Sequence, residues 1–171
     1  GANQILYSNL TNTEATATNA LNTFNNNGYT GGGDNIATNT NTAVAWQWQG
    51  GQGSNTTNTT GTITSTVSAN ATAGFSVVTY TGNGSSDGPF IYTGFKPKFV
   101  LTKNFTVGSS NGWCIMDTSR SPYNVAQAIL EPQSSATEYN GMTNTGFDFL
   151  SNGFKMRGTN SFTNANGNTY I

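Results

Sequence analysis

Residues 75–103 read FSVVTYTGNGSSDGPFIYTGFKPKFVLTK, and this stretch decides the fold class. It holds three short runs of aromatic and β-branched residues, at 75–81, 90–92 and 99–103, with glycine, asparagine and proline between them. Aromatic and β-branched residues favour strands, and the turn residues bound each strand. The stretch therefore predicts a series of short strands.

The same pattern continues on both sides of this stretch. Further strand-like runs lie at residues 42–49, 113–117, 147–150, 154–157 and 168–171. Asn-Gly dipeptides, which are strong hairpin signals, begin at residues 27, 83, 111, 140, 152 and 166. Short strands with frequent turns predict an all-β, antiparallel sandwich or jelly-roll-like fold.

The run at 99–103 also predicts how a strand packs. Val100 and Thr102 share one face, while Phe99, Leu101 and Lys103 share the other, because side chains alternate along a strand. At least one face is apolar enough to pack against a core.

We expect at most one or two short helices. The candidates are residues 12–24 and residues 123–130, the second of which follows Ser121-Pro122, a typical helix start. Residues 52–74 are a low-complexity Thr/Asn/Ser segment, and both a linker and an edge strand fit this composition.

A weak internal repeat has an offset of 124 to 127 residues. The matching segments are 5–6 with 129–130, 27–29 with 152–154, and 42–44 with 169–171. The repeat predicts that residues 1–50 are the C-terminal half of a first unit, that 51–74 are a linker or edge strand, and that 75–171 are a nearly complete second unit. The alternative is a chance match within a composition-biased sequence.

This division predicts an edge for assembly. If the second unit lacks its last strand, Tyr170 and Ile171 form an apolar edge, which invites pairing with another chain. The strand that carries Trp46 and Trp48 would complete either its own second unit or that of a neighbour. We therefore expect other copies of the chain as partners.

Charge excludes some partners. Only 8% of the residues are charged, the net charge is -1, and every Lys and Arg lies between Lys96 and Arg157. Nucleic acid is an unexpected partner, because such a chain cannot neutralise many phosphates. Insertion into a membrane is also not expected, because no stretch approaches the roughly 18 apolar residues of a span.

The residues offer little for catalysis. The chain has no histidine, which removes the usual general base. A glycosidase needs only two carboxylates, and the candidates for a polysaccharide depolymerase are Asp117, Glu131, Glu138 and Asp148. No motif links these residues, so we predict no catalytic site and no enzyme. They are more typical of turns and surfaces, and a local ion pair between Asp117 and Arg120 is expected.

Metal and thiol chemistry are similarly sparse. Asp34 and Asp87 lie in loops with oxygen-bearing neighbours that suit Ca²⁺, but each loop has only one carboxylate, so no cofactor is expected. The single cysteine, Cys114, is predicted to be a small core residue.

Flat aromatic rings and neutral amides suit the binding of sugars. Trp46, Trp48, Trp113 and Tyr92 are the candidates for a glycan-type site in an adhesin or lectin. The alternative, which applies especially to Trp46 and Trp113, is that these rings pack in the core.

Several segments in one order resemble a known module. Residues 74–84, 87–101, 113–124 and 150–155 are similar to the tandem unit of large virion proteins of marine and freshwater tailed phages. The resemblance implies a non-enzymatic virion structural protein (a tail fibre, spike or capsid decoration module), found in the virion or outside cells, with other virion proteins and a host surface glycan as partners. It implies no catalytic residue.

Overall fold

The computed structural model describes residues 2–33, 42–51, 54–86, 90–108, 111–141 and 145–171. Within these ranges the chain forms thirteen strands and no helix, and no segment is a helix that could cross a membrane. The strands are β1 (Gln4–Ile5), β2 (Ala15–Thr16), β3 (Leu21–Asn25), β4 (Gly28–Gly31), β5 (Thr56–Asn58), β6 (Ser65–Asn70), β7 (Phe75–Thr81), β8 (Phe90–Tyr92), β9 (Phe99–Lys103), β10 (Trp113–Asp117), β11 (Phe147–Leu150), β12 (Gly153–Met156) and β13 (Thr169–Tyr170).

The all-β, sandwich-like prediction is confirmed. β7 to β11 have the predicted bounds, and β12 and β13 each differ from the prediction by one residue at both ends. All strand pairs are antiparallel. The turn residues and the alternation of apolar side chains were sufficient signals here, because they act locally.

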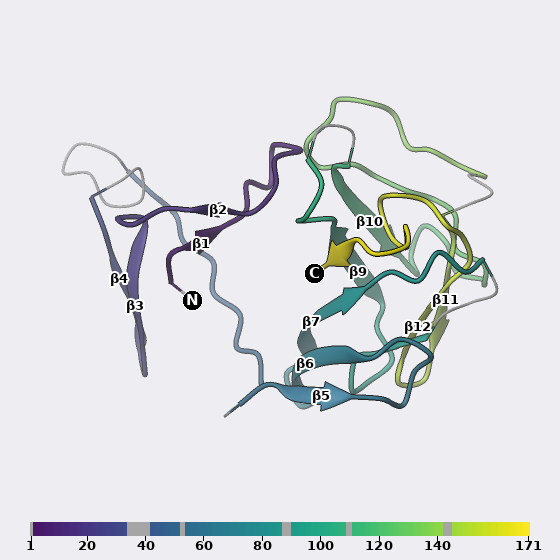
Figure 1. Cartoon of the computed structure of the whole chain (residues 1–171), viewed down its shortest axis with the longest axis horizontal. Helices are drawn as coiled ribbons and strands as arrows, with labels where there is room; N and C mark the ends of the chain where they lie inside the picture. The colour runs from purple at the N-terminus through teal and green to yellow at the C-terminus, as the bar shows by residue number, and fades with distance from the viewer. Residues whose placement is uncertain (1, 34–41, 52–53, 87–89, 109–110, 142–144) are drawn as a thin grey trace.

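Two layers of strands enclose the core, on the right of Figure 1. One layer has the order β13-β7-β6-β5 and continues to β9 and β10, because Tyr170 of β13 also bridges to Asn104, which follows β9. The other layer has the order β11-β12-β8. We call residues 54–171, which form both layers, the C-terminal part, and residues 2–51 the N-terminal part.

The core lies between the two layers. Tyr80 and Tyr170 stack with ring centroids 5.1 Å apart. In the opposite layer, the ring centroids of Phe147 and Phe154 lie 5.0 Å apart. Cys114 is fully buried among these residues, as predicted. The remaining buried apolar residues of this cluster are Ile63, Ile91, Val100, Met116, Ala126, Ile129, Phe149 and Met156.

The two predicted helices are wrong. Residues 12–24 hold β2 and the start of β3, and residues 123–130 are irregular, with bridges from Ala126 to Phe147 and from Ile129 to Tyr139. Weak helical patterns were overridden because these segments complete their backbone hydrogen bonds with neighbouring strands instead.

The predicted strand at 42–49 is also wrong. In the described part of the chain these residues pair with no strand, and their side chains are exposed. Trp46 is 76% exposed, so the alternative that its ring lies in the core is wrong as well. The alternation of side chains favours a strand, but a strand also needs a neighbour to pair with.

The segment 52–74 contributes two strands within its described residues. β6 pairs with β7 along its whole length and with β5 on its other side, so β5 forms the edge of the sheet. Ile63, Ser65 and Val67 are buried and their neighbours are not. The strand alternative therefore describes this segment better than the linker alternative.

The repeat is visible in the pairing of the chain with itself. Ile5 pairs with Ala15, and Ile129 pairs with Tyr139 in the same antiparallel manner, so one offset of 124 residues relates both partners. Sequence composition alone would not reproduce a pairing at the same spacing.

A hairpin in each part repeats this relationship. In the β3–β4 hairpin Asn25 pairs with Gly28, and in the β11–β12 hairpin Leu150 pairs with Gly153, so both have a two-residue loop at an offset of 125 residues. The bulge between Leu21 and Thr23 has no counterpart in β11, so Leu21 corresponds to Phe147 at an offset of 126 residues. β3 and β4 are thus the counterparts of β11 and β12.

Candidate interaction surface

The layer formed by β7, β9 and β10 has an apolar outer side. We call Phe75, Val77, Phe99, Leu101 and Trp113 the outer apolar face. Phe99 is 56% exposed, and Val77 and Leu101 are also exposed. The strand alternation predicted this arrangement: Val100 and Thr102 point into the core, so Phe99 and Leu101 must point away from it.

The N-terminal part covers one end of the outer apolar face. Trp48 stacks on Phe75 with ring centroids 6.2 Å apart and planes 19° apart. Together with Leu6 and Ile171, these side chains line an apolar groove of about 670 Å³ that extends along the face. The groove is open to solvent beyond Trp48, where Phe99 and Leu101 lie exposed.

Polar contacts fix the N-terminal part beside the groove. The Trp113 indole Nε1 donates to the carbonyl of Tyr7 at 2.8 Å. The backbone N–H of Gly51 donates to the Ser68 hydroxyl at 3.0 Å. These two bonds lie on different elements of the C-terminal part, so together they restrict both the position and the rotation of the N-terminal part.

Lys103 is the most unusual residue at this joint. It is fully buried at the end of β9, and its Nζ donates to the carbonyls of Thr11 at 2.9 Å and Asn111 at 2.7 Å. Burial lowers the pKa of its ammonium group below 10.5. The sequence placed Lys103 on a strand face but gave no sign that it would connect the two parts.

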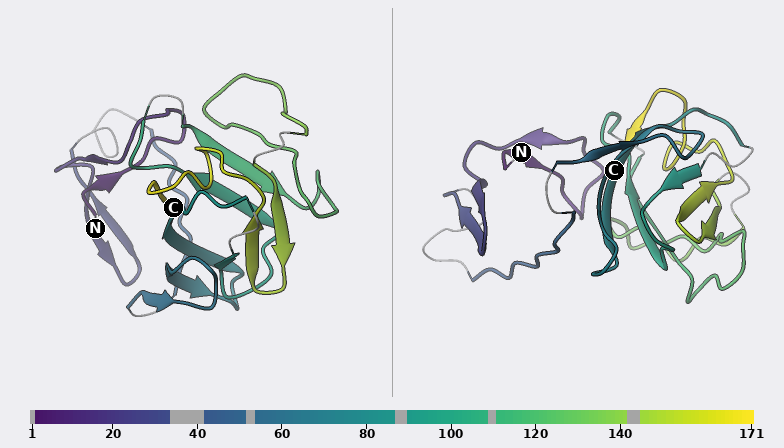
Figure 2. Two further views of the ribbon diagram at one scale, coloured as in Figure 1. Left: turned by 45° about the vertical axis from the view of Figure 1, so that its right-hand side comes forward. Right: turned by 90° about the horizontal axis from the view of Figure 1, so that it is seen from below.

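Trp46 and Trp48 form a pair at the edge of the N-terminal part. Their ring centroids lie 6.1 Å apart in an edge-to-face arrangement, and Trp48 is 63% exposed. Trp46 faces a second hollow of about 480 Å³, which the side chains of Leu21, Phe24 and Tyr29 also line. Figure 2 shows the β3–β4 hairpin standing apart from the two layers of the C-terminal part.

The other predicted site residues lie elsewhere. Trp113 is half-buried and shares the groove with Trp48, but half-buried Tyr92 lies on β8 in the opposite layer. The structure therefore brings together three of the four candidates for a glycan-type site. Trp46 contacts Trp48, and Trp48 and Trp113 line the same groove. Tyr92 does not join them.

Tyr170 and Ile171 do not form the open edge on which their predicted role in assembly rested. Tyr170 pairs with Tyr80 of β7 on one side. On the other side, Lys103 and Ile171 exchange two backbone hydrogen bonds of 2.9 and 3.1 Å. The end of the chain thus lies between β7 and β9, and its main chain has no free row of donors and acceptors there.

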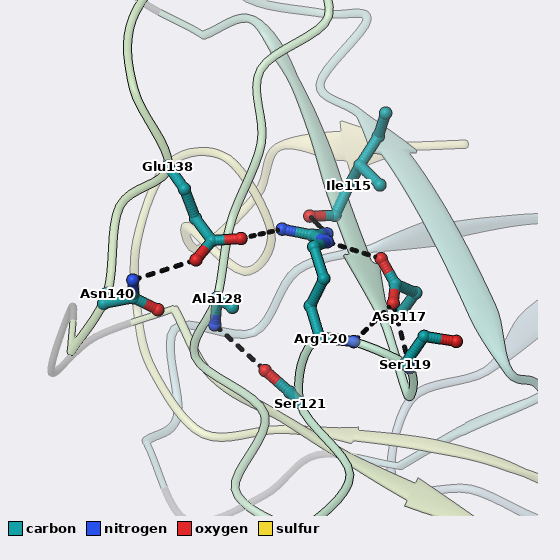
Figure 3. A network of polar contacts seen from close by, with 8 residues as sticks. All are labelled: Ile115, Asp117, Ser119, Arg120, Ser121, Ala128, Glu138 and Asn140. Carbon is teal, nitrogen blue, oxygen red and sulfur yellow. Dashed lines mark hydrogen bonds and ion pairs between the residues drawn. The ribbon is translucent and has the colours of Figure 1, made fainter.

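A polar network closes the turn that follows β10 (Figure 3). The Arg120 guanidinium donates to Asp117 Oδ2 at 2.6 Å and to Glu138 Oε2 at 2.7 Å. The Asp117–Arg120 pair was predicted, whereas Glu138 arrives from a loop 18 residues further along the chain. The network joins the β9–β10 layer to this loop.

The network also sets the ionisation of both carboxyls. Burial raises the pKa of the Asp117 carboxyl, but the Arg120 backbone N–H and guanidinium together outweigh it, so the pKa lies below 3.8. The hydrogen bond from Arg120 lowers the pKa of the Glu138 carboxyl below 4.5, with help from Asn140. Both groups are therefore ionised at neutral pH.

The two remaining carboxylate candidates have local partners. Asp148 pairs with Arg157 across the β11–β12 hairpin, and Glu131 accepts a hydrogen bond from Gln133 at 3.0 Å. Among the described residues, no three His, Cys, Asp or Glu side chains gather as metal ligands would. The Ca²⁺ candidates Asp34 and Asp87 lie outside the described residues.

These features define a tandem all-β repeat protein with exposed apolar surfaces. The chain belongs to a family characterised by a domain of unknown function, DUF7483, whose model matches residues 1–86 and again residues 79–171. The predicted tandem repeat is thereby confirmed, while the predicted boundaries near residues 50 and 75 stay a prediction. No curated protein and no solved structure matches the chain.

Proposed function

We propose that this chain is a non-enzymatic structural module of a virion, such as a tail fibre, spike or capsid decoration protein, that acts in assembly. The outer apolar face carries this proposal. It presents Phe99, Leu101 and Val77 to solvent next to an apolar groove. Contiguous exposed apolar surface of this kind typically marks an interaction site.

The rest of the composition supports assembly through this face. Only 8% of the residues are charged, so little like-charge repulsion opposes close packing of copies. The partners under this proposal are other copies of the chain and other virion proteins, and the location is the virion or the extracellular space.

The virion assignment itself draws on the resemblance of residues 75–171 to the repeated unit of phage virion proteins. The tandem match to one domain supports it, because fibres and spikes are commonly built from repeated units. Attachment to a host surface would be a further role of such a protein.

The carboxylates favour a structural role over hydrolysis. A glycosidase needs one carboxyl with a raised pKa to act as the general acid. Asp117 and Glu138, which share Arg120, both have lowered pKa values. Their contacts support a role in holding a loop in place.

The experiment that tests assembly measures oligomeric state. We expect the chain to associate at micromolar concentration in sedimentation and light scattering. Leu101→Lys should weaken this association at least about tenfold, because it places a charge on the apolar contact. Tyr123→Ser is the matched control, since Tyr123 is 83% exposed and lies outside the outer apolar face. A monodisperse monomer would count against the proposal.

Carbohydrate binding is the second candidate function, and the Trp46–Trp48 pair favours it. Two exposed rings 6.1 Å apart offer flat apolar surface to sugar rings. A glycan array with the full chain and with Trp46→Ala tests this function. Binding that the substitution abolishes would support an adhesin, and the absence of binding to every glycan would remove this candidate.

A further inference from the structure

The β3–β4 hairpin lacks neighbours that its counterpart has. β12 pairs with β11 on one side and with β8 on the other, so Gly153 lies opposite Tyr92 and Phe154 opposite Ile91. β4 pairs only with β3 among the described residues. One edge of β4 is therefore open where the equivalent edge of β12 is covered.

Side-chain burial differs in the same way. Phe149 and Phe154 are 5% and 4% exposed in the core, whereas their counterpart Phe24 is 74% exposed and Tyr29 is only half-buried. We call Leu21, Phe24, Tyr29, Val44 and Trp46, which line the hollow of about 480 Å³, the hairpin face. Its side chains are of the kind found in a core, but none of them is fully buried.

The space around equivalent glycines agrees with this difference. A Cβ on Gly153 would lie 2.0 Å from the Ile91 carbonyl oxygen, because β8 approaches closely there. A Cβ on Gly28 would meet nothing within 4 Å. Gly28 is required by its own backbone, which has a positive φ of 153°, and the space that β8 takes up beside Gly153 is open beside Gly28.

Elementary physics also makes the isolated hairpin incomplete. A two-stranded hairpin is only marginally stable in water without a third strand or a packed face. An open strand edge accepts another strand readily, through main-chain hydrogen bonds. The β3–β4 hairpin therefore has both an open strand edge and an apolar face that lacks packing partners.

We propose that the β4 edge and the hairpin face bind the N-terminal half of another unit of this repeat. The occupant is a counterpart of residues 56–117. Its β8-type strand pairs antiparallel with β4 in the register seen at β12, so that the counterpart of Tyr92 lies opposite Gly28 and that of Ile91 lies opposite Tyr29. This inference rests on the proposed structural function and assigns it a partner.

An extended chain tests the proposal. Residues 54–125 are added directly before Ala2, which reproduces the connection between residues 125 and 126 in the second unit. We expect the amides of residues 28–31 to exchange with solvent at least about 100-fold more slowly in the extended chain than in the original chain. Hydrogen exchange with mass spectrometry measures this change.

Phe24→Ala supplies the matched control. In the original chain it should leave exchange nearly unchanged, because Phe24 is exposed. In the extended chain it should abolish most of the new protection, because Phe24 then occupies the position of Phe149. Phe149→Ala should reduce protection of β12 in both chains.

Three results would overturn the proposal. The first is unchanged exchange at residues 28–31 while the added segment is protected. The second is an added segment that stays unprotected throughout, since docking is what should order it. The third is self-association of the original chain that already protects residues 28–31, which would make a second copy the occupant. None of these decides the effect of Leu101→Lys on assembly, so the two proposals fail separately.

Discussion

Trp48 and Phe75 join the two parts of the chain by stacking, with ring centroids 6.2 Å apart and planes 19° apart. Gly50 and Gly51 follow Trp48 and run close to β6: a Cβ on Gly51 would lie 3.0 Å from the Ala69 carbonyl oxygen. The aromatic contact and the close backbone approach together direct the chain from the N-terminal part onto the C-terminal part.

We therefore expect Trp48→Ala to loosen this joint. Proteolysis within residues 42–51 should become several-fold faster, whereas the free energy of unfolding of the C-terminal part should fall by no more than about 1.5 kcal/mol, the usual range for one aromatic pair. Limited proteolysis and urea unfolding measure the two effects. Trp46→Ala is the control, because Trp46 touches the ring of Trp48 but not that of Phe75; equal effects of both substitutions would contradict the assignment.

Removing the Tyr170 hydroxyl should destabilise the core. This hydroxyl donates to the Ser161 carbonyl at 3.0 Å and accepts from the Ala165 N–H at 2.9 Å. Tyr170→Phe leaves both partners without that bond, so we expect a loss of about 1 to 3 kcal/mol in the free energy of unfolding. Tyr123→Phe removes an exposed hydroxyl and should change nothing measurable. Denaturant unfolding of both variants decides the matter.

Lys103 should make the free energy of unfolding depend on pH in the alkaline range. Burial lowers its pKa in the folded state, so the unfolded chain binds more protons between that folded pKa and 10.5. The free energy of unfolding should therefore rise with pH through this window, as the folded state sheds its buried charge.

The comparison of Lys103→Met with the original chain isolates this contribution. Burial raises the pKa values of Cys114, Tyr80 and Tyr170, which act in the opposite direction at high pH in both proteins. The free energy of unfolding of the original chain, minus that of Lys103→Met, should rise between pH 7 and pH 10, because only Lys103 differs between the two proteins. Lys98→Met, at an exposed position, should keep the pH dependence of the original chain.

The contacts of Arg120 with Asp117 and Glu138 should stabilise the fold at neutral pH and lose this effect in acid. The folded pKa values of Asp117 and Glu138 are depressed, so their contribution is present above about pH 4.5 and is lost as the pH falls through the folded pKa values. Arg120→Gln should lower stability at neutral pH and flatten the acid dependence below pH 4.5. Circular dichroism during acid titration measures this, and an unchanged acid midpoint would show that the network does not contribute.

Gly153→Ala should separate β12 from β8. Its Cβ would lie 2.0 Å from the Ile91 carbonyl oxygen, which cannot move without breaking the sheet. We expect a loss of about 3 kcal/mol or more, at the upper end for overpacking. Gly33→Ala, where a Cβ meets nothing within 4 Å, should be nearly neutral. A mild effect of Gly153→Ala would indicate that β8 and β12 can separate at little cost.

The sequence determined the strands from β7 to β13, because the alternation in segments such as 75–81 and 113–117 and the turn residues around them act over a few neighbours. The same locality explains the errors. Residues 42–49 have the pattern of a strand, but they pair with no strand among the described residues. Residues 12–24 have a helical pattern, but they contribute to β2 and β3, which pair with β1 and β4 instead.

The tandem repeat, the buried Cys114 and the Asp117–Arg120 pair could also be predicted from the sequence by itself. Only the tertiary structure decided that Tyr170 lies between two strands, that Lys103 is buried against Thr11, and that Phe24 is exposed while its counterpart Phe149 is not. These outcomes depend on which distant segments meet. A residue's burial is therefore a property of its neighbours in space, and two equivalent side chains of a repeat can differ when only one has them.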